Sequence, residues 1–192
     1  MKYIISMLMT FLLLTGCTAS EQPADIAATT LPVYEFTTFL CQGTPLTVTQ
    51  LVTEEVSCLH DYSLNVRQVK AAEAAEAVVI SGAGLEDFLD DVLNHSLMID
   101  ASEGITLLCP DDADHHDHDH EHSGHSHDQD PHIWLSPAHA RAMVDNIARG
   151  LSNMYPEYTE VFLHNAAALA AQLDALQKYG NDTLSVLSSR EL

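Results

Sequence analysis

Histidine and carboxylate side chains alternate through residues 111–129, whose sequence is DDADHHDHDHEHSGHSHDQ. Imidazole nitrogens suit Zn²⁺ and Cu²⁺ as ligands. Apolar side chains are almost absent, so burial cannot offset the entropy of ordering this stretch. We therefore predict a mobile accessory loop that binds several metal ions weakly; the alternative is an acidic surface loop without a function. Its histidines are His115, His116, His118, His120, His122, His125 and His127.

A second metal-binding chemistry is indicated directly after this loop, at Asp130-Pro131-His132-Ile133-Trp134. Large apolar side chains can fix the position of the imidazole ring there. We interpret His132 as a ligand of a defined metal site; the alternative is a capping or core histidine beside Trp134. His60 lies in a loop that follows a predicted strand.

Strand and helix patterns alternate in the first part of the chain. Short β-branched or apolar runs predict strands at 26–31, 46–52, 78–81, 97–100 and 105–108. Apolar residues at helical spacing predict helices at 33–40, 66–77 and 85–93. This alternation predicts an α/β fold: a single Rossmann-like lobe with a mostly parallel sheet flanked by helices. His60 and His132 would both lie at the carboxyl edge of that sheet, where open α/β folds bind ligands.

Two more helices are predicted after the histidine-rich loop. Ser136-Pro137 combines an N-cap with a first-turn proline and opens a helix to about residue 151. A longer helix is predicted from about 157 to 187, weakened by Gly180-Asn181. It would exceed about 40 Å, so it must pack on something beyond the lobe. We place the lobe at 26–152 and the long helix at 153–192.

The charge of the chain excludes one class of partner. It has 28 acidic and 7 basic residues among 192, a formal net charge of −21. Such a surface attracts cations and repels the phosphates of nucleic acids. We therefore expect no nucleic-acid binding.

The N-terminus resembles an export signal. Lys2 precedes the apolar run 4–14, which is too short for a membrane span, and Leu14-Thr15-Gly16-Cys17 resembles a bacterial lipobox. We expect a signal peptide at 1–16, a lipid on Cys17 that anchors the protein to the membrane, and a tether at 17–25. The alternative is an ordinary signal peptide with a chance cysteine. The protein would be extracytoplasmic, in a periplasm or at a cell surface.

The other cysteines leave their redox state open. Cys41, Cys58 and Cys109 could form one disulfide with a free thiol, or remain three thiols. No C-x-x-C pair occurs, which argues against a thiolate zinc knuckle.

Several segments in this order resemble the zinc and manganese solute-binding lipoproteins of bacterial ABC transporters, the zinc-uptake branch in particular. They are Thr29-Thr30-Leu31-Pro32-Val33-Tyr34, His60-Asp61-Tyr62, residues 77–86 (AVVISGAGLE), the histidine-rich loop, and residues 130–137 (DPHIWLSP).

The resemblance implies two α/β lobes joined by one long helix, with a metal ion in the cleft between them. His60 and His132 look like the two ligands of the first lobe, and the remaining histidine and carboxylate come from the second. This chain ends at Leu192, so we expect a truncated linker helix and no second lobe. It also departs from the family pattern at Ser63-Leu64-Asn65, where prolines are frequent, and at Cys58.

The function implied is extracytoplasmic capture of Zn²⁺, with Mn²⁺ as the alternative cargo, and its delivery to an ABC permease without catalysis. One alternative is an extracytoplasmic metal buffer or a nonfunctional truncated binding protein. A metallohydrolase is the other, and it is disfavoured because neither H-E-x-x-H nor a carboxylate cluster with the spacing of such enzymes occurs.

Overall fold

The computed structural model describes residues 23–53, 62–89, 98–108 and 129–187. The strands are β1 (Ile26–Ala28), β2 (Val48–Gln50), β3 (Ala77–Ile80) and β4 (Met98–Asp100), and the helices are α2 (Leu31–Leu40), α3 (Val66–Ala74), α4 (Pro137–Met154) and α5 (Thr159–Leu184). Short 3₁₀ turns lie at Asp87–Leu89, Ile133–Leu135 and Pro156–Tyr158.

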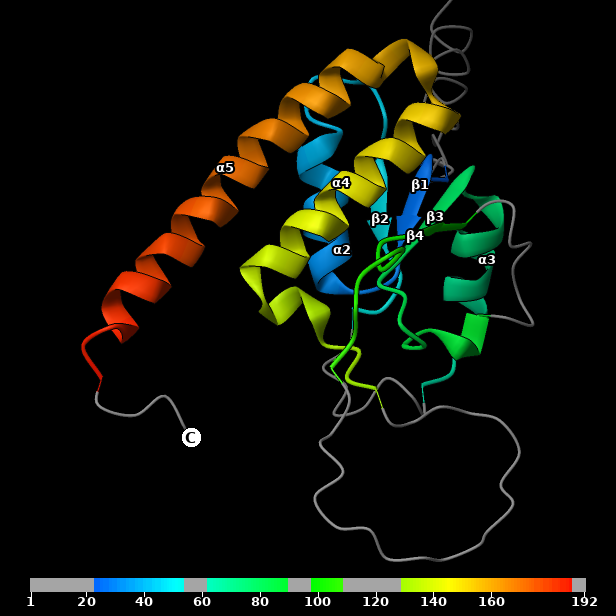
Figure 1. The fold of residues 1–192 in the computed structure, drawn as a ribbon. Coiled ribbons are helices and arrows are strands. Elements are labelled where there is room, and N and C mark those ends of the chain that lie inside the picture. The colour runs from blue at the N-terminus through cyan, green and yellow to red at the C-terminus, as the bar shows by residue number, and fades with distance from the viewer. Residues whose placement is uncertain (1–22, 54–61, 90–97, 109–128, 188–192) are drawn as a thin grey trace, which may run out of the picture.

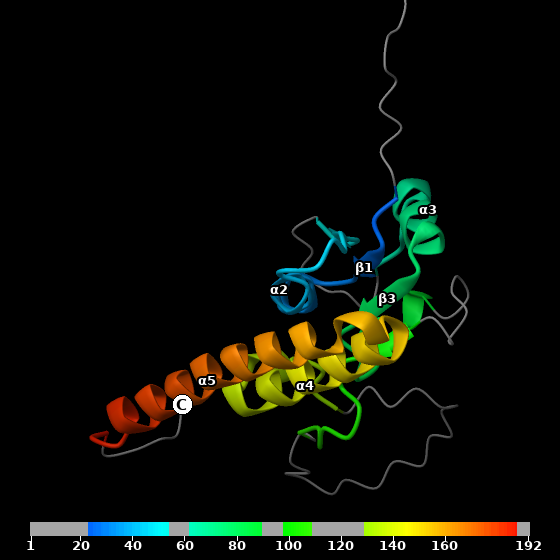
Figure 2. The same ribbon diagram turned by 90° about the horizontal axis from the view of Figure 1, so that it is seen from above.

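The strands form one parallel sheet in the order β2-β1-β3-β4. Successive side chains of a strand point to opposite faces, so both faces must be covered. Ile26 and Ala28 of β1 join the core beneath α2, α4 and α5, whereas Ala27 joins the core beneath α3. Figure 2 shows α3 on the side of β1 and β3 opposite to α4 and α5. The predicted α/β lobe with a mostly parallel sheet and a long C-terminal helix is confirmed.

Helix α5 is held along its first half and extends past the lobe along its second. Phe162, Ala166 and Ala170 are buried against the core. Asn165 donates to the carbonyl oxygens of Leu40 and Gln42, and so ties α5 to the end of α2. Beyond Leu173, which is partly buried against the core, the large apolar side chains of α5 are exposed, namely Leu176, Tyr179 and Leu184. The 26-residue helix spans roughly 39 Å and protrudes in Figure 1.

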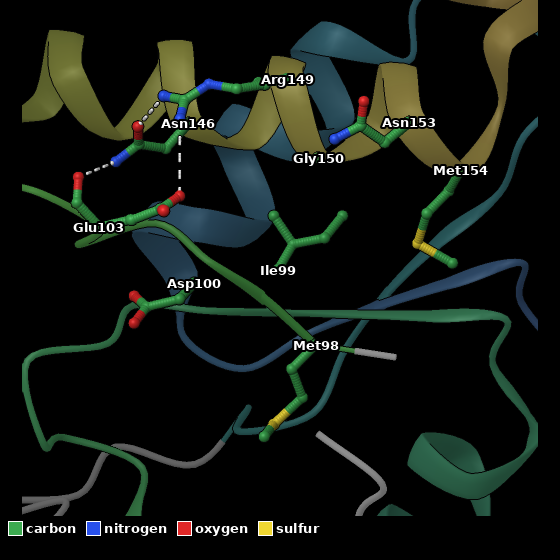
Figure 3. A pocket seen from close by; sticks show the side chains of 9 residues that line it. All are labelled: Met98, Ile99, Asp100, Glu103, Asn146, Arg149, Gly150, Asn153 and Met154. Carbon is green, nitrogen blue, oxygen red and sulfur yellow. Dashed lines mark hydrogen bonds and ion pairs between the residues drawn. The ribbon is translucent and has the colours of Figure 1, made fainter. Parts of the chain in front are cut away.

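Helix α4 approaches β4 very closely at one glycine. A Cβ on Gly150 would lie 2.5 Å from Cγ2 of Ile99. Asn146, one turn earlier, donates to the carbonyl oxygens of Ala101 and Glu103 at 2.8 and 2.9 Å. Figure 3 shows Gly150 beside Ile99 and the bond from Asn146 to Glu103, at a cavity of about 260 Å³ between β4 and α4.

Two predicted elements are wrong, and a third is changed. The predicted helix 85–93 is reduced to the 3₁₀ turn Asp87–Leu89 in its described part, where the carboxylate of Glu86 accepts hydrogen bonds from the end of β3. Residues 105–108 form no strand. Helix α5 starts at Thr159 after the Pro156 turn and passes through Gly180 without a break. The predicted N-cap at Ser136 is confirmed, with His139 N–H donating to its hydroxyl oxygen at 3.5 Å.

In the described part of the chain, no helix is long and apolar enough to cross a membrane.

Replacing Gly150 by alanine is expected to lower the free energy of unfolding by about 1–3 kcal/mol, because the new methyl group overlaps Ile99 and forces α4 away from β4. Gly180→Ala is the matched control, since a Cβ there meets nothing within 4 Å. It should be neutral or stabilise α5 by up to about 1 kcal/mol. Denaturant titration measures the free energy of unfolding of both variants. Equal changes in the two variants would show that α4 is not held against β4 by the close contact at Gly150.

Candidate functional site

His132 lies at the carboxyl edge of the sheet, and the side chains of α4 show why. Asn146 contacts residues just after the carboxyl end of β4, whereas Gly150 faces Ile99 within the strand. Helix α4 therefore runs antiparallel to β4, and its first turn projects beyond the carboxyl end of the strands. His132 is the residue before the 3₁₀ turn Ile133–Leu135 that leads into α4. In Figure 1 this segment lies at the lower end of the molecule, toward which β1 points.

The imidazole of His132 has a fixed partner on one side only. Oδ1 of Asp130 lies 2.7 Å from Nδ1 and also accepts the backbone N–H of His132 at 3.0 Å. The ring of Trp134 meets the imidazole edge to face, with centroids 5.2 Å apart. The His132 side chain is 52% exposed. Its Nε2 atom has no hydrogen-bond partner among the described residues.

The pKa of Asp130 lies below its ordinary value. The main cause is the backbone N–H of His132, followed by the hydrogen bond from the His132 ring. Asp130 is therefore a carboxylate at neutral pH and a permanent acceptor for this ring.

His60 falls outside the described residues, but the chain just after it is placed. The side-chain amide of Gln68 donates to the hydroxyl of Tyr62 and to the carbonyl of Leu51, both at 2.7 Å. Leu51 directly follows β2, so Tyr62 lies at the carboxyl edge of that strand. The ring of Tyr62 also meets Phe88, with centroids 5.5 Å apart. The chain two residues after His60 is thus anchored at the edge on which His132 lies.

The remaining candidate residues lie outside the described residues. They are Cys17, Cys58, Cys109 and the loop histidines His115, His116, His118, His120, His122, His125 and His127. Cys41 is described, as a buried free thiol at the end of α2. Burial raises its pKa to about 12, so it supplies no thiolate for a metal at neutral pH.

A buried carboxylate organises the same edge of the sheet, and the sequence reasoning assigned it no role. Glu86 is 5% exposed. Its Oε1 accepts the Thr29 hydroxyl at 2.6 Å and the Ser81 N–H at 2.8 Å, and its Oε2 accepts the Gly82 N–H at 2.9 Å. The pKa of Glu86 is raised to about 7, mainly by burial and to a smaller extent by the nearby charge of Asp100, although these three donors lower it. The signal in the sequence was weak: an acidic residue, followed by Asp87, a few positions after an apolar strand pattern.

Gly82 allows this arrangement because its backbone is left-handed, with φ of +78°. A Cβ at Gly82 would collide with the carboxylate of Asp100 and the hydroxyl of Ser102. Oδ1 of Asp100 in turn accepts both the N–H and the hydroxyl of Ser102 at 2.7 Å. Gly82-Ala83-Gly84 is thus a close-packed turn that directly follows β3.

The described residues provide one well-placed ligand rather than a complete metal site. Residues 23–53, 62–89, 98–108 and 129–187 contain no group of three or more His, Cys, Asp and Glu side chains that could hold a metal ion. A zinc ion usually takes four ligands. His132 can donate one imidazole nitrogen, and within these residues no group of three such side chains forms around it.

Comparison with known proteins gives a family. The model of the family described as "Zinc-uptake complex component A periplasmic" matches residues 26–192. A zinc-binding lipoprotein, AdcA, of Streptococcus pneumoniae serotype 4 is 32% identical over 182 residues, which is 91% of this chain and 36% of that protein. A putative metal-binding protein of Treponema pallidum is 29% identical over 137 residues, 68% of this chain and 43% of that protein.

Solved structures agree with the fold. The Zn(II)-bound crystal structure of AdcA from Streptococcus pneumoniae matches with a TM-score of 0.70 and 30% identity, over 87% of this chain and 34% of that one. A crystal structure of ZnuA matches with a TM-score of 0.70 and 26% identity, over 87% of this chain and 61% of that one. The chain thus spans between about a third and three fifths of the relatives named here.

The buried carboxylate predicts a pH dependence of stability. The folded-state pKa of Glu86, about 7, lies above its ordinary value of 4.5, so the folded protein holds a proton that the unfolded chain releases. The contribution of Glu86 is therefore fully present below pH 4.5 and is lost as the pH rises through 7. The loss should be on the order of 3 kcal/mol.

Denaturant titrations across this pH range measure the effect as the difference between the wild type and Glu86→Gln. The exposed Glu103→Gln variant is the matched control and should keep the wild-type slope. Parallel curves for the wild type and Glu86→Gln would contradict the assignment.

Proposed function

The chain belongs to the family of zinc-uptake complex component A, and from this premise we propose that it captures Zn²⁺ outside the cytoplasmic membrane and delivers it to a membrane ABC permease. Zinc is cargo in this proposal, and no bond of a substrate is made or broken. The observation that carries it is the placement of His132 at the carboxyl edge of the sheet, with Nδ1 held by Asp130 and Nε2 without a partner in the described part of the chain.

His60 is proposed as the second ligand. The anchoring of Tyr62 beside Leu51 supports this role, because it returns the chain to the carboxyl edge two residues after His60. Two imidazoles are half of a tetrahedral zinc shell, so a tight site needs further ligands. In the proposed mechanism those ligands lie outside the part of the chain described here.

The choice of zinc rests on ligand chemistry. Neutral imidazole binds Zn²⁺ more strongly than Mn²⁺, following the general order of divalent metal affinities. Mn²⁺ remains the alternative cargo. The names of the relatives support zinc, since AdcA is a zinc-binding lipoprotein and was crystallised with Zn(II).

The accessory histidines of residues 111–129 are proposed to collect metal ions near the site, and Cys17 is proposed to carry the lipid that keeps the protein at the membrane. A net charge of −21 supports the first of these roles, because it raises the local concentration of cations. An extracytoplasmic zinc buffer is the second candidate function. It is favoured by the single placed ligand, which suits weak and reversible binding.

A zinc titration of the whole chain should show several weak sites. Deleting residues 114–127 is expected to remove most of the bound zinc, because it takes away seven histidines. In the deleted protein, His132→Ala should weaken the remaining binding by more than about tenfold. His164→Ala, which removes an exposed histidine of α5, is the matched control and should change nothing. Calorimetry with Zn²⁺ and with Mn²⁺ measures both affinity and number of sites.

Equal zinc affinity in the His132→Ala and His164→Ala variants would overturn the assignment of His132. Delivery to a permease is tested by zinc uptake in cells that depend on this protein. Loss of uptake with His132→Ala at normal protein abundance is expected. Unchanged uptake would favour the buffer.

A further inference from the structure

We propose that Asp130 positions His132 for zinc by keeping the proton on Nδ1 and leaving the Nε2 lone pair for the metal. This inference rests on the proposed function, because it concerns the same site. It assigns a role to a residue that does not itself contact the metal. Three features of the described structure carry it: a shared acceptor oxygen, a turn that fixes the spacing, and an aromatic neighbour on the ring.

One oxygen of Asp130 holds both the backbone and the ring of His132. Oδ1 accepts the His132 N–H at 3.0 Å and lies 2.7 Å from Nδ1 of the same residue. A carboxylate can only accept hydrogen bonds. The nitrogen at 2.7 Å must therefore carry a proton, and neutral His132 is then protonated at Nδ1 alone. Nε2 becomes the nitrogen with the free lone pair, which is the form that a metal ion requires.

The local backbone sets this geometry. An aspartate that accepts the N–H two residues later forms a compact Asx turn. Pro131 stands between the two residues, is buried, and has its φ angle fixed by its ring. Asp130 and His132 consequently keep a constant separation. The N–H of Asp130 also donates to the carbonyl oxygen of Leu108 at 2.9 Å, which ties the turn to the chain that follows β4.

Trp134 restricts the ring from another side. The two aromatic rings meet at 61° with centroids 5.2 Å apart. Turning the imidazole by half a revolution would exchange its two faces and break the Nδ1 contact with Asp130. Nε2 therefore keeps one position on a ring that is about half exposed. The metal would meet a nitrogen whose direction is already set.

Removing the Asp130 carboxylate is expected to lower zinc affinity without a comparable loss of folding stability. An exposed ion pair contributes only about 0–1 kcal/mol to stability, and Asp130 and His132 are both about half exposed. Residues that orient a metal-bound histidine commonly change metal affinity by about 10–100-fold. Asp130→Ala should therefore leave the protein folded while zinc affinity at His132 falls by that factor.

The test reads the tautomer and the affinity separately. Nitrogen NMR of the zinc-free whole chain distinguishes Nδ1–H from Nε2–H when the pH is high enough for histidine to be neutral. The His132 signal is identified by its loss in His132→Ala. Zinc is then added at buffered free concentrations, so that occupancy of His132 is read independently of the other histidines. The variants are Asp130→Ala, Asp130→Asn and, as a control for charge, the exposed Asp145→Ala.

We expect the Nδ1–H form in the wild type and in Asp145→Ala, and its loss in Asp130→Ala together with the fall in affinity. Asp130→Asn keeps an acceptor oxygen but no charge, so its affinity should be intermediate. An unchanged Nδ1–H population in Asp130→Ala, or unchanged zinc affinity, would overturn the inference while zinc capture through His132 still stood. Failure of zinc to perturb the His132 signal in the wild type would overturn the proposed function itself.

Discussion

The contact of Gly150 with Ile99 determines where the features of the carboxyl edge can lie. Parallel strands must be covered on both faces, and on one face the backbone of α4 at Gly150 packs directly onto the Ile99 side chain of β4. Asn146 fixes the position of α4 along β4 through two carbonyl oxygens just past the strand. The first turn of α4 consequently projects beyond the sheet, and the segment with Asp130 and His132 is carried to the ligand-binding edge.

The same edge contains a buried carboxylate, and the unfavourable free energy of burying it must be offset by neighbouring groups. A buried charge is unfavourable unless it is hydrogen-bonded, and Glu86 receives three donors from the ends of β1 and β3. These bonds join two neighbouring strands to the Gly82 turn. The edge is thereby rigid on the β1–β3 side, where no candidate ligand lies. On the β2 and α4 sides, Tyr62 and Asp130 anchor the segments that do carry candidate ligands.

The sequence predicted helices and strands well where the residue pattern is compatible with only one type of secondary structure. Helix α4 begins at Pro137 as its N-cap predicted, and β3 differs by one residue at each end. Strands β1 and β2 are shorter than predicted because the ladder between them pairs only three residues of each strand. The predicted helix at 85–93 is only a 3₁₀ turn in its described part, because helical spacing of apolar residues does not distinguish such a turn from a continuous helix. His132 was predicted from its motif, whereas the role of Asp130 depends on an oxygen-to-nitrogen distance that no sequence pattern specifies.

Charge alone cannot explain selection of a metal by such a protein. A net charge of −21 attracts Mg²⁺ and Ca²⁺ as well as Zn²⁺, and carboxylates prefer the former two. Selection has to come from nitrogen ligands, and a neutral imidazole offers its lone pair on either of two nitrogens. A carboxylate 2.7 Å from one of them removes that ambiguity before the metal arrives. Asp130 thus uses negative charge to set up a neutral ligand, and that ligand favours zinc over the harder cations that the rest of the surface also attracts.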